Sequence, residues 1–212
     1  MIRSWKAVKA RINHCRRCET DHVRQLVVPT GHKRHSPYSP PRPTRLLFVS
    51  VAPPWGGSYF WDETQADTLR AGLFAALTTA GYPVATPDEF CEQGFFMVPA
   101  VKCPSCHNGK DARPAAGAVT NCAPFLREQC AIIAPERILA LGQAAMDSLA
   151  GAFGLQTTGT LGKDRQHPWR VMLAGRHVPV SGTYFAGTRR HRKFGDIIAD
   201  IRTMLDGDGW GK

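Results

Sequence analysis

The chain has 212 residues, with 27 Lys and Arg against 17 Asp and Glu, which gives a formal net charge of +10 at pH 7. This length supports one domain with a large buried core, and we expect a single domain over residues 1–212. No run of about 18 apolar residues is present, and the first residues do not resemble a signal peptide. The composition excludes a helical membrane protein, and we expect a cytoplasmic protein with no membrane partner.

The helices and strands predicted from the sequence alternate along the chain. A short basic helix is expected over residues 2–13, and the apolar run at residues 45–52 is typical of a buried parallel strand. An aromatic and Gly-rich loop follows, and helical spacing then covers residues 64–81, which end on a glycine. The later predictions are strands over residues 94–101, 137–141, 170–173 and 177–180, and helices over residues 118–133, 143–149 and 194–205.

This alternation predicts an α/β domain with a parallel sheet that helices cover on both faces. In such domains ligands bind beyond the carboxyl ends of the strands. Three loops follow strand ends here, at residues 53–62, 99–106 and 182–193. We therefore look for functional residues in these loops.

Basic residues are clustered in the segments 3–17, 32–45 and 189–193. Such clusters attract phosphates and give binding that weakens steeply with salt, although a solvated charged surface produces the same pattern. The clustering favours a nucleic acid as the partner.

Four of the seven cysteines fall into two pairs, a C-x-x-C formed by Cys15 and Cys18 and a second pair formed by Cys103 and Cys122. Thiolates from two distant segments are typical of a zinc or iron–sulfur centre that ties an N-terminal arm to the domain. Cys106 competes with Cys122, because its spacing from Cys103 would complete a zinc ribbon. The odd number of cysteines favours ligands and buried thiols over disulfides.

Several motifs occur in a characteristic order along residues 13–201. They are the C-x-x-C, a strand ending in Ala52-Pro53, the run Val101-Lys102-Cys103, the run Cys122-Ala-Pro-Phe-Leu-Arg127, and Gly182-Thr183-Tyr184. This order resembles the iron–sulfur branch of the uracil-DNA glycosylase superfamily, its families four and five.

The resemblance implies a three-layer α/β/α sandwich with a central four-stranded parallel sheet, a 4Fe–4S cluster and excision of a base from DNA. Matching positions imply that Cys15, Cys18, Cys103 and Cys122 hold the cluster, so that residues 1–30 form a cluster-binding arm. The implied partner is DNA. We expect a monomer, since repair glycosylases of this size work alone.

The active-site motifs depart from the family pattern at three positions. Val51 replaces an acidic residue that polarises water, Pro99 replaces an asparagine that reads uracil, and Phe185 replaces a histidine that stabilises the leaving base. Lost hydrogen bonds remove most of the discrimination that a pocket can achieve. We therefore predict that the target is a modified or damaged base, such as a bulky modified cytosine of phage DNA, in antiviral defence rather than repair.

Cleavage of an N-glycosidic bond needs a base outside the stack and stabilisation of a cationic sugar and an anionic base. Phe60 stands where the family has its stacking ring, and Asp62 is the predicted carboxylate, although it also suits a helix cap. His191 is predicted to reach the leaving base or a phosphate. The other predicted base contacts are Ser50, Val51, Ala52, Pro53, Pro99, Tyr184 and Phe185, and the predicted phosphate contacts are Lys102, Arg189, Arg190, Arg192 and Lys193.

Three alternative functions stay open on the sequence. One is uracil excision in DNA repair, and a second is a DNA-binding protein that has lost catalysis. The third is a small zinc-ribbon protein that binds nucleic acid.

Overall fold

The computed structural model describes residues 4–20, 36–56, 59–165, 168–187 and 193–207. At its centre lies a five-stranded sheet of order β2-β1-β5-β7-β6. Four of these strands are parallel, and the fifth pairs antiparallel with β7 at the edge. The strands are β1 (Leu46–Ser50), β2 (Phe95–Pro99), β5 (Arg137–Leu141), β6 (Trp169–Leu173) and β7 (Arg176–Thr183).

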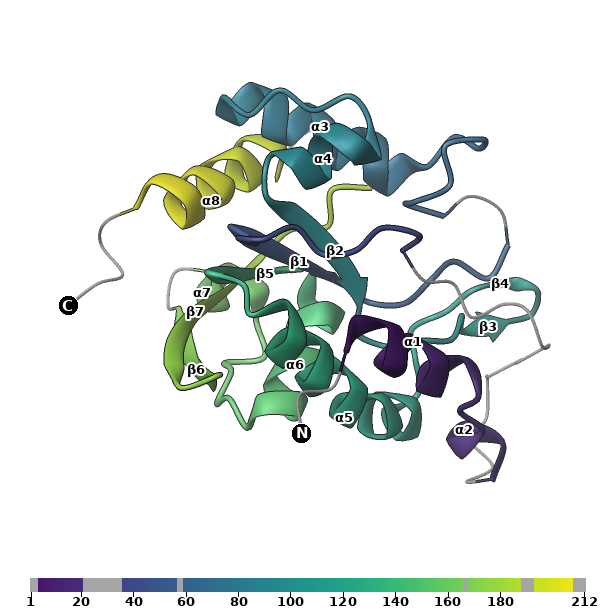
Figure 1. Cartoon of the computed structure of the whole chain (residues 1–212). Coiled ribbons are helices and arrows are strands. Elements are labelled where there is room, and N and C mark those ends of the chain that lie inside the picture. The colour runs from purple at the N-terminus through teal and green to yellow at the C-terminus, as the bar shows by residue number, and fades with distance from the viewer. Residues whose placement is uncertain (1–3, 21–35, 57–58, 166–167, 188–192, 208–212) are drawn as a thin grey trace.

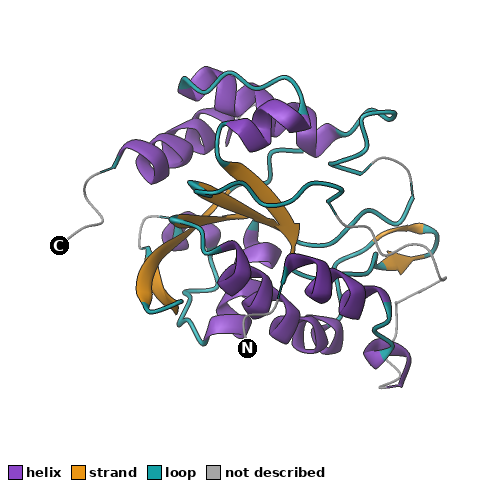
Figure 2. Cartoon of the chain, in the orientation of Figure 1, coloured by secondary structure: helices purple, strands orange, loops and turns teal. Residues whose placement is uncertain are grey.

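Helices cover both faces of the sheet, as Figures 1 and 2 show. One layer contains α1 (Trp5–Asn13), α5 (Ala116–Ile133) and α6 (Gln143–Phe153), and the opposite layer contains α3 (Thr68–Ala80), α4 (Pro87–Glu92) and α8 (Phe194–Asp206). This arrangement confirms the predicted α/β/α fold. The antiparallel strand β6 extends the four parallel strands by one.

Short elements complete the domain. They are α2 (Arg17–Thr20), α7 (Leu161–Asp164) and a hairpin of β3 (Cys106–His107) with β4 (Lys110–Asp111). Sequence reasoning did not predict the hairpin, α4 or α7, because segments of two to six residues show no periodicity.

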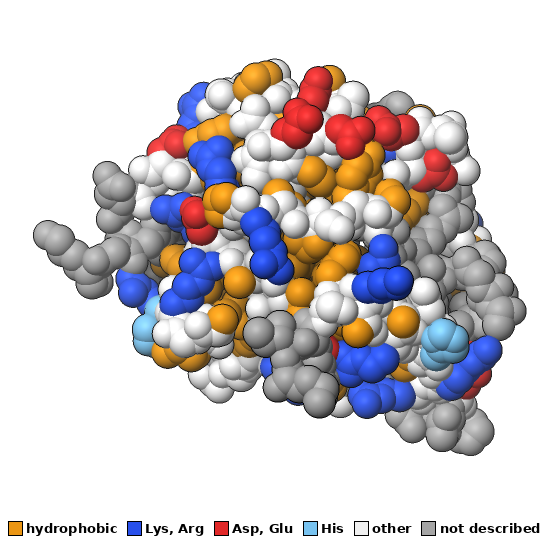
Figure 3. Space-filling view, in the orientation of Figure 1, with side chains coloured by type: hydrophobic (Ala, Val, Ile, Leu, Met, Phe, Trp, Pro, Cys, Tyr) orange, Lys and Arg blue, Asp and Glu red, His pale blue; other side chains and the backbone are white. Residues whose placement is uncertain are grey.

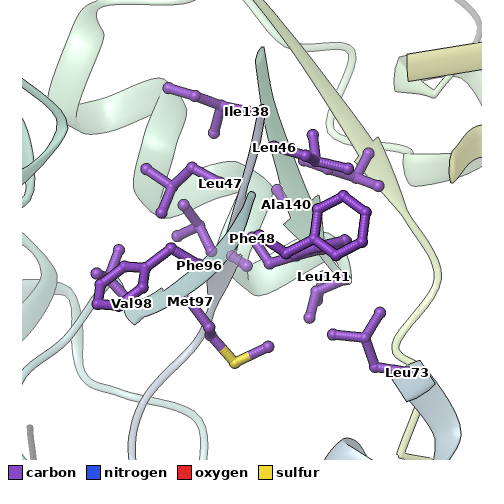
Figure 4. Packing of buried hydrophobic residues seen from close by; sticks show 14 of the residues in the cluster. Leu46, Leu47, Phe48, Leu73, Phe96, Met97, Val98, Ile138, Ala140 and Leu141 are labelled. Atoms are coloured by element: carbon purple, nitrogen blue, oxygen red, sulfur yellow. The ribbon is translucent and has the colours of Figure 1, made fainter. Parts of the chain in front are cut away.

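The core lies between the sheet and its two helical layers. Every residue of β1 and β2 is buried, as expected for parallel strands covered on both faces. Figure 4 shows Phe48 of β1 and Met97 of β2 on the side of the sheet where Leu73 of α3 lies. The sheet therefore holds the ends of β1 and β2 in fixed positions.

Helix α3 begins later than predicted, at Thr68 instead of Thr64. The reason is that Asp67 is its N-cap, with a side chain that accepts a hydrogen bond of 2.6 Å from the backbone N–H of Arg70. Gly81 ends the helix in a left-handed conformation with φ of 107°.

The surface charge is uneven. Figure 3 shows acidic side chains gathered over the layer of α3 and α4, whereas Lys and Arg side chains are spread over the rest of this face. Among the described residues, no helix has the length and apolar character required to cross a lipid bilayer.

Gly72 of α3 allows a close approach to the loop that follows β7. A Cβ atom at this position would lie 2.0 Å from the carbonyl oxygen of Ala186, which belongs to backbone and cannot swing away. Gly151 of α6 is the matched case, since a Cβ atom there would meet nothing within 4 Å.

We expect Gly72→Ala to lower the free energy of unfolding by about 1–3 kcal/mol, because overpacking against Ala186 outweighs the helix preference of alanine. Gly151→Ala should raise it by about 0.5–1 kcal/mol. Urea denaturation of both variants measures these changes. A stabilised Gly72→Ala protein would show that the loop does not pack on α3 in this way.

Candidate functional site

A pocket lies beyond the carboxyl ends of β1 and β2, where a doubly covered parallel sheet binds its ligands. We call it the strand-end pocket, and its cavity volume is about 30 Å³. Its walls come from the loop after β1, the aromatic segment, the start of α3 and the end of β2. The lining residues are Ser50, Ala52, Pro53, Pro54, Tyr59, Phe60, Trp61, Asp67, Leu69, Met97 and Pro99.

The structure brings together five of the predicted base contacts in this pocket, namely Ser50, Ala52, Pro53, Phe60 and Pro99. The other three are not in its lining. Val51 points into a different pocket, described below, and Tyr184 and Phe185 lie on the loop after β7.

Phe60 is held by other rings while it lines the pocket. Only 3% of it is exposed, and its ring makes edge contacts with Trp61, Phe74 and Phe90 at centroid distances of 4.9, 5.7 and 5.4 Å. The two expected roles, packing of the loop and formation of a stacking wall, are therefore compatible. A ring fixed by edge contacts is a rigid wall for a flat ligand.

The carboxylate in the pocket lining is that of Asp67, not the predicted Asp62. The Asp62 carboxylate closes a turn, because its Oδ1 accepts hydrogen bonds from the backbone N–H of Thr64 at 3.1 Å and from the Thr64 hydroxyl at 2.5 Å. Asp67 caps α3 and lines the pocket at the same time. Sequence reasoning missed Asp67, and its place directly before an apolar helical run is the signal that could have identified it.

The loop after β7 is tied down by a polar network. The Thr183 hydroxyl donates to Oδ2 of Asp200 at 2.6 Å, and the Arg165 guanidinium donates to both Asp200 oxygens at 2.9 and 2.7 Å. Arg165 and Lys193 also stand over the Tyr184 ring, at 5.4 and 4.7 Å from its centroid. Burial raises the pKa of Asp200, and the bonds from Arg165 and Thr183 oppose this shift.

The predicted phosphate contacts of this loop are only partly described. Arg189, Arg190, His191 and Arg192 lie outside the described residues. Lys193 is exposed and forms an ion pair of 3.4 Å with Asp196. Phe185 is 39% exposed, which is unusual for a large apolar side chain beside a candidate site.

A second pocket, which we call the side pocket, lies at the same end of the sheet and has a cavity volume of about 390 Å³. It is bounded by Val51 and by the first turns of α5 and α6. Arg113 and Asp147 form an ion pair of 2.7 Å in its wall, and the Gln143 amide donates to Asp147 at 2.7 Å. Sequence reasoning missed Arg113 and Asp147, because neither belongs to a motif that identifies a function.

All four predicted ligand cysteines line a third pocket, the cysteine pocket, which has a cavity volume of about 20 Å³. Cys15 and Cys18 come from the N-terminal arm, Cys103 follows β2, and Cys122 lies on α5. Cys106 is not in the lining and sits on β3 of the hairpin. The structure therefore brings Cys122, rather than Cys106, to the other three cysteines.

The donor set of the cysteine pocket consists of thiols, which are ligands of both zinc and iron–sulfur centres. No three His, Cys, Asp or Glu side chains of the described residues lie close enough to hold a single metal ion, which needs ligands about 2.0–2.3 Å from its centre. Two N–H groups point to sulfur, from Lys102 to Cys122 at 3.4 Å and from the Asn121 side chain to Cys18 at 3.7 Å. Such bonds are common around iron–sulfur thiolates. Burial raises the pKa of the Cys122 thiol.

The arm reaches the pocket by docking on α5. Val8 and Ile12 of α1 are fully buried against Phe125 of α5, and Arg11 pairs with Glu128. The Arg17 guanidinium stands 5.6 Å from the centre of the Phe125 ring. These contacts place Cys15 and Cys18 beside Cys122 of α5.

Lys102 is not a surface residue, contrary to the prediction that it contacts DNA phosphate. Only 2% of it is exposed, and its ammonium donates to the carbonyl oxygen of Pro99. Burial lowers the pKa of Lys102 to about 8. An enclosed ammonium cannot reach a phosphate on the outside of the protein.

Comparison with known proteins identifies the family. The model of the family described as the uracil DNA glycosylase superfamily matches residues 36–177. A type-5 uracil-DNA glycosylase of Pyrobaculum aerophilum is 29% identical over 119 residues, which are 53% of this chain and 51% of that protein. The chain is thus matched to about half the length of this relative. The motif order, the fold and these matches agree, and the chain belongs to the uracil DNA glycosylase superfamily.

Proposed function

We propose that the protein is a DNA glycosylase that takes a base out of the DNA stack and hydrolyses its N-glycosidic bond. The observation that carries this proposal is the strand-end pocket, in which the rigid ring of Phe60 and the carboxylate of Asp67 line one cavity. A flipped base needs a flat wall, and a cationic sugar needs a nearby negative charge. The name of the relative, a type-5 uracil-DNA glycosylase, supports the same reaction class.

In this proposal Phe60 stacks on the extruded base, and Asp67 orients the attacking water or balances the charge of the sugar. Asp67 suits this role because the N-terminus of α3 favours a negative charge at its cap. Lys193 and the basic residues 189–192 grip phosphates. We further propose that the protein acts on DNA as a monomer in the cytoplasm.

We propose that the substrate is a modified or damaged base rather than uracil. The pocket wall is mainly apolar, with Pro99 at the end of β2 and Ala52, Pro53, Leu69 and Met97 around it. Such a wall has no side-chain amide to read the edge of uracil. The replacement of three polar motif residues by Val51, Pro99 and Phe185 also supports a base other than uracil. We propose a bulky modified cytosine of phage DNA, which would assign the enzyme to antiviral defence.

A panel of DNA duplexes tests the substrate. Each duplex carries one base, either uracil, hypoxanthine or glucosylated hydroxymethylcytosine, and abasic sites are detected by strand cleavage in alkali. We expect abasic sites on the bulky modified base and little or none on uracil. Excision of uracil alone would assign the protein to repair, and DNA binding without excision of any base would make it a binding protein.

The charge of Asp67 is tested separately from its capping role by Asp67→Asn, because asparagine caps a helix about as well as aspartate. We expect a loss of about 100-fold or more in the single-turnover rate of excision, with an unfolding free energy close to that of the wild type. Asp62→Asn is the matched control and should retain the rate. The reverse result would return the catalytic role to Asp62.

We also propose that Cys15, Cys18, Cys103 and Cys122 hold a 4Fe–4S cluster in the cysteine pocket. The thiolates of the arm, the end of β2 and α5 would share one inorganic core. The cluster would supply a structural clamp, because segments far apart in the chain would be bound to a common centre.

Cys122→Ser and Cys106→Ser separate the cluster from the alternative zinc site. We expect the wild type and Cys106→Ser to carry about four irons per chain and to absorb near 400 nm, whereas Cys122→Ser loses both signals. Iron analysis and absorbance of anaerobically purified protein give the answer. Zinc in place of iron, or loss of metal only in Cys106→Ser, would establish the zinc ribbon.

A further inference from the structure

Lys102 is a cation enclosed in the protein without a carboxylate partner. It is 2% exposed, and none of the ion pairs formed by the described residues includes it. The hydrogen bond of its ammonium to the Pro99 carbonyl satisfies a donor but supplies no negative charge. A buried charge that is neither paired nor neutralised is strongly unfavourable, so this position calls for an anion.

The groups around Lys102 show where that anion belongs. Lys102 lines the cysteine pocket together with Cys103 and Cys122. Its own backbone N–H donates to the sulfur of Cys122 at 3.4 Å. Glu19, the carboxylate in the pocket lining, is 41% exposed and bound to Arg16 at 2.8 Å. An anion inside the cysteine pocket is therefore the partner that the lysine lacks.

Lys102 also connects the cysteine pocket to the strand-end pocket. Its ammonium holds the carbonyl of Pro99, and Pro99 lines the strand-end pocket. Between these residues, the N–H of Ala100 donates to the backbone carbonyl of Ser50 at 2.7 Å, and the N–H of Val101 donates to the backbone carbonyl of Val51 at 2.9 Å. The segment 99–103 thus runs from one pocket to the other, and hydrogen bonds of Ala100, Val101 and Lys102 hold it in place.

We propose that Lys102 is the buried counter-charge of the anionic cluster and the positioning residue that couples the cluster to the strand-end pocket. This inference rests on the cluster of the proposed function. A fixed cation beside the thiolates stabilises the more negative, reduced form of the cluster, which raises its reduction potential. The buried ammonium would also attract the anionic cluster in a place where water cannot take over that interaction.

The test compares Lys102→Met, which removes the charge and keeps a long side chain, with Lys163→Met, a change of an exposed lysine of α7. Both are purified without oxygen as the holoprotein. In Lys102→Met we expect absorbance near 400 nm to disappear about tenfold faster or more in the presence of an iron chelator. We also expect a more negative reduction potential. Lys163→Met should match the wild type in both measurements.

Thermal unfolding with and without iron distinguishes a counter-charge from a lysine that merely fills space. With the cluster present, Lys102→Met should unfold at a lower temperature than the wild type. After the iron is stripped, the variant should be as stable as the wild type or more stable, because the wild type then buries an unpaired charge. Equal loss of stability in both forms would overturn the proposal.

The remaining outcomes separate this inference from the proposed function. A wild type with about four irons and a Lys102→Met protein with unchanged iron release and potential would overturn only the role of Lys102. A wild type without iron would overturn the cluster and the role of Lys102 together. The excision reaction is judged by the duplex panel. If Lys102→Met loses excision while iron release and reduction potential stay unchanged, the counter-charge role is rejected. Lys102 would then act on the wall of the strand-end pocket alone.

Discussion

The pairing of β2 with β1 beyond their last strand residues is the constraint on which both candidate centres depend. Parallel hydrogen bonds continue from Ala100 to Ser50 and from Val101 to Val51, so the two chains leave the sheet together. Pro99 is thereby held in the wall of the strand-end pocket, and Cys103 is held in the cysteine pocket. A shift of one residue in this register would turn every side chain of the segment to the opposite face. Pro99 and Cys103 would then no longer line their pockets.

The same register explains why the two pockets at the strand ends differ in character. Successive side chains of an extended segment point to opposite faces, so Ser50 lines the strand-end pocket whereas Val51 lines the side pocket. The first is enclosed by aromatic rings and prolines, and the second contains the Arg113–Asp147 ion pair. The proposed function uses the strand-end pocket, which supplies an apolar wall for a flat base.

Charge is distributed unevenly between the surface and the interior. The net charge is +10, and most Lys and Arg side chains among the described residues are exposed, as suits a partner rich in phosphate. Lys102 is the exception, because its motif placed it beside a cysteine but did not reveal that β2, α5 and the arm would enclose it. A charge run on a surface and a single buried cation look alike in a sequence, since exposure depends on what packs over each residue.

The sequence by itself determined the alternation of strands and helices, the buried character of β1 and β2, and the cysteines and loops to be searched, because apolar runs, caps and motif order are local properties. Strand β5 was predicted to the residue, whereas α3 was predicted to begin at Thr64 because Asp62 suited a helix cap, and the structure caps α3 with Asp67. Only the tertiary structure placed Asp67 rather than Asp62 in the lining of the strand-end pocket, Cys122 rather than Cys106 in the lining of the cysteine pocket, and Lys102 inside the protein. Each of these choices depends on which segments meet in space, and residues far apart in the chain carry no local sign of that meeting.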